Sequence, residues 1–200
     1  MSTTNMRGLT FGAAVAFLIA TVLAVPAGPA SAGGLRPGVE SAAAGEFDQA
    51  TMDRVGAELA ATAAHRSRVL GRVSVCYNAH LADIGWQGQR CDGRIAGTTG
   101  ENRRMEAIMI SLGDGTVCYN AHLADIGWQG QRCDNAVAGT TGQSRRMEAI
   151  KVVSAAADIC YDAHVQNIGW QGRRCGGATA GTTGQSRQME AIRITASPIR

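Results

Sequence analysis

The sequence is poor in aromatic residues and in lysine, and its charge is nearly balanced. Only 4% of its 200 residues are aromatic, and Lys151 is the single lysine. The formal net charge of +3 is too small for a nucleic-acid-binding surface, which normally shows a clustered basic stripe. Arginine pairs recur at Arg103-Arg104, Arg145-Arg146 and Arg173-Arg174. Neighbouring carboxylates balance these pairs, which is typical of a solvated surface. The alternative is that the pairs contact an anionic wall polymer. We expect no nucleic-acid partner.

Motifs for catalysis and for metal binding are also missing. The sequence contains no Gly-x-Ser-x-Gly, no His-Glu-x-x-His and no Cys-x-x-Cys. A catalytic site needs a nucleophile, a base and an orienting group at one place, normally once per domain. Here every candidate residue occurs three times, and the recurring histidines and glutamates lie far apart along the chain. We therefore expect no enzyme activity, no metal site and no cofactor.

Long apolar runs are absent except for one near the start of the chain. It spans residues 9–25, follows Arg7 and precedes Pro26 and the segment Ala30-Ser31-Ala32, whose small residues fit a signal peptidase site. We expect a signal peptide over residues 1–32. The alternative is an uncleaved transmembrane anchor, for which the run is short against a hydrocarbon core of about 30 Å. The mature chain is then expected outside the cell, without membrane insertion.

A unit of 42 residues occurs three times in the rest of the sequence. The letters CYNAHLADIGWQGQRC of segment 76–91 recur unchanged at 118–133, and with changes at 160–175. The three repeats are residues 73–114, 115–156 and 157–200. A constant period indicates one supersecondary unit per repeat, which must pack against its copies to bury an apolar face.

Six cysteines lie in the repeats, two in each. In an exported protein an even number at repeated spacing predicts disulfides. Equivalence of the three repeats leaves three of the 15 pairings that six cysteines allow. We expect the local pairing, which joins Cys76 to Cys91, Cys118 to Cys133 and Cys160 to Cys175. Each bond closes a loop of about 15 residues, worth about 3 kcal/mol in the chain-entropy model.

Within a repeat the residue pattern favours β-strands. Apolar residues alternate with polar or cysteine positions from Val75 onward, and β-branched and aromatic residues are common. Residues 97–100, Gly-Thr-Thr-Gly, predict a turn. A last strand is expected over 105–110, where Met105 and Ile108 share a face only if a bulge or a helical turn intervenes.

These elements predict an all-β domain of three-fold pseudo-symmetry, built as a β-prism or a trefoil-like barrel. Residues 33–72 differ in composition and are interpreted as a spacer. Within them, apolar residues at helical spacing predict a helix over 48–68. Its apolar stripe is thin, so this helix would be marginal in isolation.

The letters that survive in the third repeat carry a family resemblance. In the first repeat they are Tyr77, Ala79-His80, Gly85-Trp86-Gln87, 96–100 and 105–108. They resemble the ChW repeat, a secreted bacterial repeat named for its hydrophobic character and its tryptophan. The resemblance covers all three repeats, and it implies an extracellular or cell-surface protein with a role in adhesion or polymer binding. It supplies no catalytic residues, and the cysteine pair in each unit departs from many relatives.

Five residues in each repeat are candidates for ligand contact. They are His80, Trp86, Gln87, Thr98 and Thr99, then His122, Trp128, Gln129, Thr140 and Thr141, then His164, Trp170, Gln171, Thr182 and Thr183. The tryptophan would offer a flat apolar platform to a sugar ring, and the glutamine amide would bond its hydroxyl groups. The alternatives are a tryptophan buried in the core and a histidine bonded to a backbone carbonyl. Glu106 and its copies are expected to pair with arginine.

Together these features predict a non-catalytic, lectin-like module that binds a polysaccharide or a cell-wall glycan. Three equivalent sites in one rigid body would gain avidity on a polymer. One alternative is a protein-interaction or adhesion module whose partner is an extracellular protein. Another is a structural component of the cell surface.

Overall fold

The computed structural model describes residues 49–199, so the predicted signal peptide at 1–32 lies outside the described residues. The described chain forms one helix, α1 (Gln49–Leu70), and fifteen strands. The long strands are β1 (Val75–Leu81), β5 (Met105–Leu112), β6 (Val117–Leu123), β10 (Met147–Ser154), β11 (Asp158–Val165) and β15 (Met189–Ser197). The two-residue strands are β2 (Gly85–Trp86), β3 (Arg90–Cys91), β4 (Ala96–Gly97), β7 (Gly127–Trp128), β8 (Arg132–Cys133), β9 (Ala138–Gly139), β12 (Gly169–Trp170), β13 (Arg174–Cys175) and β14 (Ala180–Gly181).

Each repeat contributes two long strands with three short ones between them. The long strands pair antiparallel, β1 with β5, β6 with β10 and β11 with β15. The sequence pattern does not reveal the three short strands, because a two-residue strand is too short to show an alternation.

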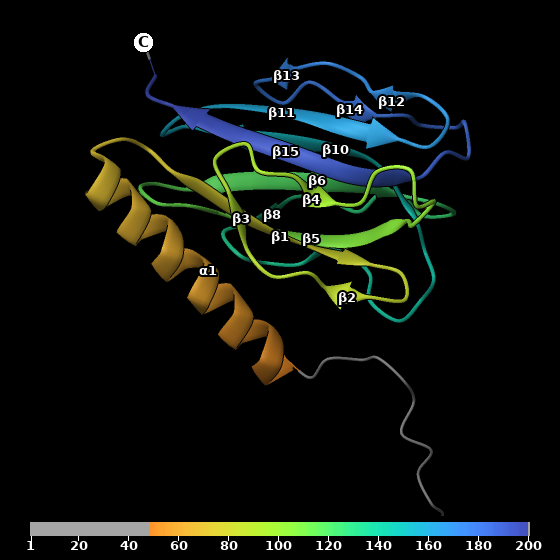
Figure 1. Ribbon diagram of the computed structural model, residues 1–200, viewed down its shortest axis with the longest axis horizontal. Coiled ribbons are helices and arrows are strands. Elements are labelled where there is room, and N and C mark those ends of the chain that lie inside the picture. Colours follow the sequence, from red (N-terminus) through yellow and green to blue (C-terminus); the bar gives the residue numbers. More distant parts are fainter. Residues whose placement is uncertain (1–48, 200) are drawn as a thin grey trace, which may run out of the picture. The chain divides into compact units, whose positions relative to one another are not determined.

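The repeats exchange one short strand in a closed circle. The first sheet has the order β2-β1-β5-β9, with β3 beside β1, so its strand β9 comes from the second repeat. In the same way β14 of the third repeat joins the second sheet, and β4 of the first repeat joins the third sheet (Figure 1). The three sheets stay separate, as in a β-prism. The predicted all-β domain with three-fold pseudo-symmetry is confirmed.

One glycine per repeat makes the strand exchange possible. Gly97 has a φ of 109°, and a Cβ atom there would lie 2.2 Å from the carbonyl oxygen of Glu190 in the third sheet. Gly139 and Gly181 stand in the same position against Glu106 and Glu148. Only glycine combines this backbone conformation with so close an approach. The close packing of one repeat on the next therefore explains why the motif has Ala-Gly at this position.

The inward faces of the three sheets enclose one core, which contains a tyrosine from each repeat. The Tyr77 hydroxyl donates to the carbonyl of Arg94 in its own repeat and accepts from the amide of Ile194 in the third repeat, at 3.0 Å. Equivalent hydrogen bonds link Tyr119 to Ala136 and Ile110, and Tyr161 to Ala178 and Val152. Burial raises the pKa of Tyr77 to about 12, so the hydroxyl stays a donor. These bonds join each repeat to the preceding one and close the circle.

A β-bulge places two core residues on one face of the last strand. The register of β1 against β5 shifts at this point, since His80 lies opposite Ala107 while Leu81 lies opposite Met105. Met105 and Ile108 are therefore both fully buried, and the predicted need for a bulge is met. The extra residue of the bulge is Glu106. Bulges often re-aim a side chain next to a functional site, and this one brings Glu106 to the histidine of the neighbouring strand.

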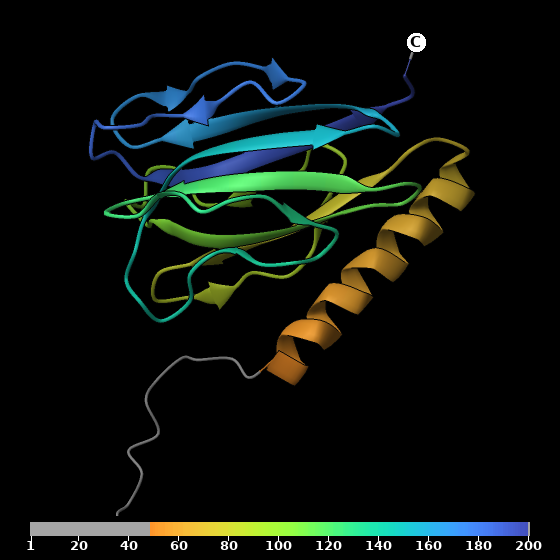
Figure 2. The same ribbon diagram turned by 180° about the vertical axis from the view of Figure 1, so that it is seen from behind.

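Helix α1 lies against the outer face of the first sheet, away from the strands of the third (Figures 1 and 2). Leu59 and Ala63 are fully buried there, in one cluster with Met109 of β5 and the first disulfide. Arg66 forms an ion pair of 2.8 Å with Asp92 at the same interface. Residues 49–70 thus form the helix expected over 48–68, and this helix packs on the first sheet. No helix among the described residues has both the length and the apolar character needed to cross a membrane.

The disulfides follow the local pairing. Cys76 is bonded to Cys91, Cys118 to Cys133 and Cys160 to Cys175. In each repeat the two cysteines are direct cross-strand partners, so the bond joins a long strand to the short strand beside it. The first disulfide lies under α1, whereas Cys175 of the third is exposed.

Candidate inter-repeat clefts

Equivalent clefts open where the sheet of one repeat meets the turn of the next. The first has a volume of about 490 Å³ and is lined by His80, Leu81, Ala82, Asp83, Ile84, Gly85, Arg104 and Glu106, with Gly142 and Ser144 from the second repeat. Another, of about 450 Å³, is lined by His164, Gln166, Asn167, Ile168, Gly169 and Glu190, with Gly100 and Asn102 from the first repeat. Most of these positions differ by two repeat lengths. We call them the inter-repeat clefts.

A histidine and a glutamate meet at the floor of each cleft. His80 Nδ1 lies 3.3 Å from a carboxylate oxygen of Glu106, and the same distance is 3.2 Å for His122 and Glu148 and 3.1 Å for His164 and Glu190. The expectation that these residues lie far apart is wrong in space, because antiparallel pairing of β1 with β5 closes the sequence gap and the bulge turns the glutamate outward. Burial lowers the pKa of His80, and Glu106 offsets only part of this effect.

Each buried glutamate has a second partner, which is the predicted arginine in the first two repeats. Arg104 Nε donates to Glu106 at 2.9 Å, and Arg146 donates to Glu148 at the same distance. In the third repeat a glutamine replaces the arginine, and Gln188 donates to Glu190 at 3.3 Å. A buried carboxylate needs such partners because removing its charge from water is costly. The glutamate therefore anchors the cleft floor.

The predicted tryptophan lies outside the central core and is partly exposed. Ligand contact by it stays a prediction. Its ring packs edge-on against the cleft histidine, with centroids 5.3 Å apart for Trp86 and His80. Distances of 5.2 and 5.4 Å recur in the second and third repeats. Trp128 is 36% exposed, and Trp86 is half-buried beside α1. The indole thus backs the histidine from outside the cleft and restricts its orientation.

The predicted glutamine holds the exchanged strand in place. The side-chain oxygen of Gln87 accepts a hydrogen bond of 2.7 Å from the Gly97 amide. Gln129 makes the same bond to Gly139 at 2.7 Å, and Gln171 to Gly181 at 2.6 Å. The side-chain oxygen that is expected to bond a ligand is therefore hydrogen-bonded within the fold.

The predicted threonines lie on the turn that forms the second wall of each cleft. The Thr98 amide donates to the carbonyl of Glu190 in the adjacent sheet at 3.0 Å, and Thr140 and Thr182 do the same to Glu106 and Glu148. The three hydroxyls are buried and have no hydrogen-bond partner among residues 49–199. The next threonine is exposed at 99 and 183 and half-buried at 141. Ligand contact by these residues stays a prediction.

An exposed isoleucine on the rim of the clefts was missed by the sequence reasoning. Ile84, Ile126 and Ile168 are 47%, 46% and 47% exposed. Ile84 and Ile168 line the two clefts, and Ile126 holds the equivalent position in the second repeat. Each follows a residue with positive φ, which is Asp83, Asp125 or Asn167. The available signal was the survival of Ile-Gly-Trp-Gln-Gly in the third repeat, where only the tryptophan and glutamine drew attention.

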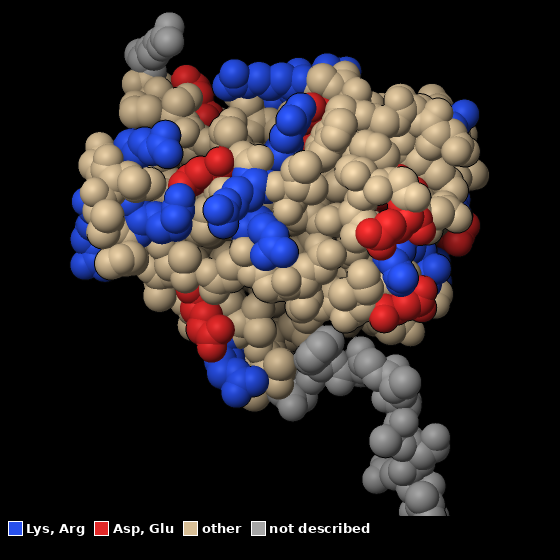
Figure 3. Space-filling view, viewed as in Figure 1, with Lys and Arg blue, Asp and Glu red and all other residues tan. Residues whose placement is uncertain are grey.

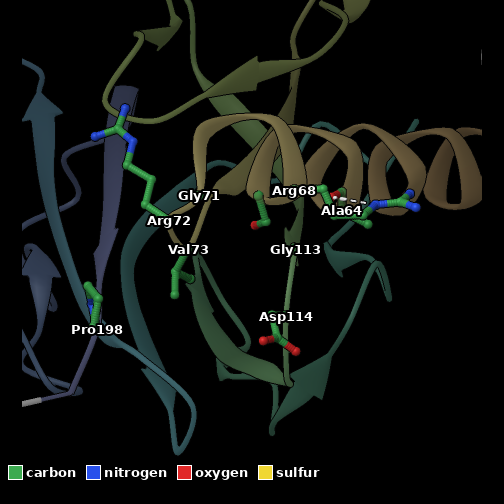
Figure 4. A pocket seen from close by; sticks show the side chains of 9 residues that line it. Ala64, Arg68, Gly71, Arg72, Val73, Gly113, Asp114 and Pro198 are labelled. Carbon is green, nitrogen blue, oxygen red and sulfur yellow. Dashed lines mark hydrogen bonds between the residues drawn. The ribbon is translucent and has the colours of Figure 1, made fainter.

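The described residues outside the clefts add little chemistry. No group of three or more His, Cys, Asp or Glu side chains that could hold a metal lies within 49–199. A hollow of about 500 Å³ lies at the end of α1, between Arg72, Asp114 and Pro198. Figure 4 shows Arg68 folded back along the helix there, donating to the Ala64 carbonyl. This hollow uses none of the letters that the repeats share.

A comparison with family models identifies the same three repeats. The model of the family described as Clostridial hydrophobic W, or ChW, matches residues 80–114, 122–153 and 164–197. The chain belongs to this family of repeat proteins, which is not an enzymatic kind. No curated protein and no solved structure matches the chain. Three disulfides and membership of this family fit an extracellular protein.

Proposed function

We propose that this protein is a secreted, non-catalytic module that binds a polysaccharide or a cell-wall glycan at its inter-repeat clefts. The observation that carries this proposal is the convergence of the shared letters. The histidine, the Ile-Gly pair, the glutamate and the glycine of the neighbouring turn come from two repeats and line one cleft.

The chemistry of the clefts suits a sugar. The exposed isoleucine offers an apolar contact for the C–H face of a sugar ring, and the histidine, the aspartate and the turn offer polar contacts for hydroxyl groups. The buried glutamate is held by two partners, so it orients the histidine rather than attacking a substrate. Catalysis would need further groups converging on the same place.

Multivalency follows from the closed circle of repeats. Because each cleft uses residues of two neighbours, the exchange of strands fixes the relative positions of the clefts. A polymer bound in one cleft experiences a raised effective concentration at the next. Weak binding per cleft would thus give useful affinity for a repetitive glycan, but not for a single sugar.

A glycan array with the intact protein tests this function, followed by titration of the best ligand. Replacing Ile84 and Ile168, together with Ile126 at the equivalent position of the second repeat, by serine should weaken binding by about tenfold or more, because the apolar contact is lost in both clefts. The matched control is Ile95→Ser, since Ile95 is 45% exposed and lines neither cleft. Unchanged binding by the triple variant contradicts the proposal. Retention of one protein in a pull-down from culture medium, without glycan binding, favours the protein-interaction alternative.

A further inference from the structure

The outer faces of the three sheets differ, although their backbones are equivalent. On the first sheet the central position is Met109, which is fully buried in the cluster under α1. The equivalent positions on the second and third sheets are Lys151 and Arg193, and both are exposed. Among the described residues no helix covers these two faces, because α1 packs on β1 and β5.

On each open face a cation lies over an indole ring. Lys151 Nζ lies 4.7 Å from the centre of the Trp128 ring. On the third sheet Arg193 Cζ lies 4.6 Å from the centre of the Trp170 ring. Such contacts orient the cation over the ring and leave its remaining N–H groups available to a ligand.

Both faces carry uncompensated positive charge. Lys151 forms no ion pair with any described residue. On the third sheet a hollow of about 290 Å³ is lined by Arg173, Arg193, Asp162 and Thr195, with Cys160, Tyr161 and Gly172. Its one carboxylate, Asp162, pairs with Arg193 at 2.7 Å, which leaves Arg173 unbalanced. Figure 3 shows Lys and Arg side chains gathered over β13, beside this hollow.

A second copy of α1 does not fit these faces. On the first sheet the helix buries Leu59 and Ala63 against Met109. Lys151 or Arg193 at that position would be buried without a carboxylate from the helix stripe, which is strongly unfavourable. The charge of the faces instead matches an anionic ligand, and the indoles match a sugar ring.

We propose that the open outer faces of the second and third sheets bind a polysaccharide that carries carboxylate groups, as a polyuronate does. The sugar ring packs on the exposed part of Trp128 or Trp170, and the carboxylate takes hydrogen bonds from Lys151 or from Arg193 and Arg173. Charge-assisted bonds of this kind are the strong ones, and arginine can make two to one carboxylate. The inference rests on the proposed function only in taking the ligand to be a glycan, since it uses a different surface.

The test replaces each cation by the residue that the first sheet carries. The variant Lys151→Met/Arg193→Met should bind polygalacturonate about tenfold more weakly or worse, and wild-type binding should fall with added salt. Because Arg193→Met alone would leave the buried Asp162 without its partner, the variant also carries Asp162→Asn, the residue type that Asn78 and Asn120 provide at this position. Circular dichroism checks the fold. A second variant, Lys151→Arg/Arg193→Lys, keeps the charge and should retain binding.

The outcomes separate this inference from the proposed function. The inference is supported if the Met variant loses polygalacturonate binding while the serine variant of the clefts keeps it. This result would not depend on whether the clefts bind a neutral glycan. Equal binding of polygalacturonate by the Met variant and the wild type overturns the inference. Wild-type binding of polyglutamate as tight as that of polygalacturonate also overturns it, because the faces would then recognise acidic polymers without regard to the sugar.

Discussion

The first and second sheets contain an identical segment in different surroundings. Residues 76–91 and 118–133 have the same letters and the same strand pairing. Every residue of β1 is nevertheless buried, whereas β6 alternates between buried and half-buried positions. The difference comes from α1, which covers one sheet and leaves the other open. Identical sequence therefore determines the backbone of a repeat but not the exposure of its outer face.

The covered face has a cost that the open one avoids. The Trp86 Nε1 atom is buried and has no hydrogen-bond partner among the described residues. An unpaired buried donor of this kind costs about 1–3 kcal/mol. Burial of Leu59 and Met109 offsets that cost, since a fully buried apolar side chain contributes about 1.5–3 kcal/mol.

The largest expected effect comes from exchanging the central residues of the two faces. Met109→Lys places an unpaired charge under α1 and should destabilise the protein by about 3–5 kcal/mol. The reciprocal change, Lys151→Met on the open face, should stay within about 0.5 kcal/mol. Urea unfolding followed by circular dichroism measures both. Similar stabilities for the two variants would mean that α1 does not pack on the first sheet in solution.

The next largest effect is expected at Gly113, which lies against α1 in the first repeat and is replaced by alanine in the second. A Cβ atom on Gly113 would lie 2.1 Å from the Ser67 hydroxyl and 2.3 Å from the Ala63 carbonyl oxygen. Gly113→Ala should therefore cost about 1–3 kcal/mol through overpacking. Ala155 holds the same position in the second repeat, and Ala155→Gly should cost less than about 1 kcal/mol. An alanine at 113 that leaves the urea midpoint unchanged contradicts the close contact.

The pH dependence of stability tests the burial of the first cleft. The pKa of His80 is lowered in the folded protein, so below its unfolded value of about 6.5 the unfolded chain binds more protons. Its contribution is thus fully present above that pH and is lost as the pH falls toward the folded pKa. His80→Gln should flatten the pH dependence in this window, measured by urea midpoints from pH 7.5 down to about 5. An unaltered slope would show that His80 does not titrate differently on folding.

The smallest expected effect concerns tryptophan fluorescence and not stability. Variants that keep a single tryptophan should differ in acrylamide quenching, with Trp128 quenched more strongly than Trp86, because α1 shields the latter. Phenylalanine at the other two positions preserves an aromatic ring. Equal quenching constants would contradict the difference in cover between the two sheets.

Much of the fold follows from local residue patterns. The alternation from Val75 and the conflict between Met105 and Ile108 predict a strand and its bulge, and the period predicts a three-fold body. The residues that carry the family resemblance can also be recognised from the sequence alone. The docking of α1 was not predicted, although Met109 and Gly113 are signals for it, since their counterparts are Lys151 and Ala155. A single substitution becomes meaningful only when a partner surface is known.

The site was less predictable than the fold. His80, a candidate for ligand contact by its place in the motif, lines the first cleft, whereas its pairing with Glu106 depends on strand register. Ile84 resembles an ordinary strand residue until its exposure is seen. Gln87 holds the exchanged strand and Trp86 packs against the histidine, and ligand contact by these residues stays a prediction.

The sequence by itself determined the repeat, its strands, its turns and its disulfide pairs, because these depend on neighbours within one unit of the chain. Only the tertiary structure decided which residues of different repeats line a cleft, and which of three equivalent sheets is covered. Those outcomes depend on register, on strand exchange and on the docking of one helix, which bring together residues that lie far apart along the chain.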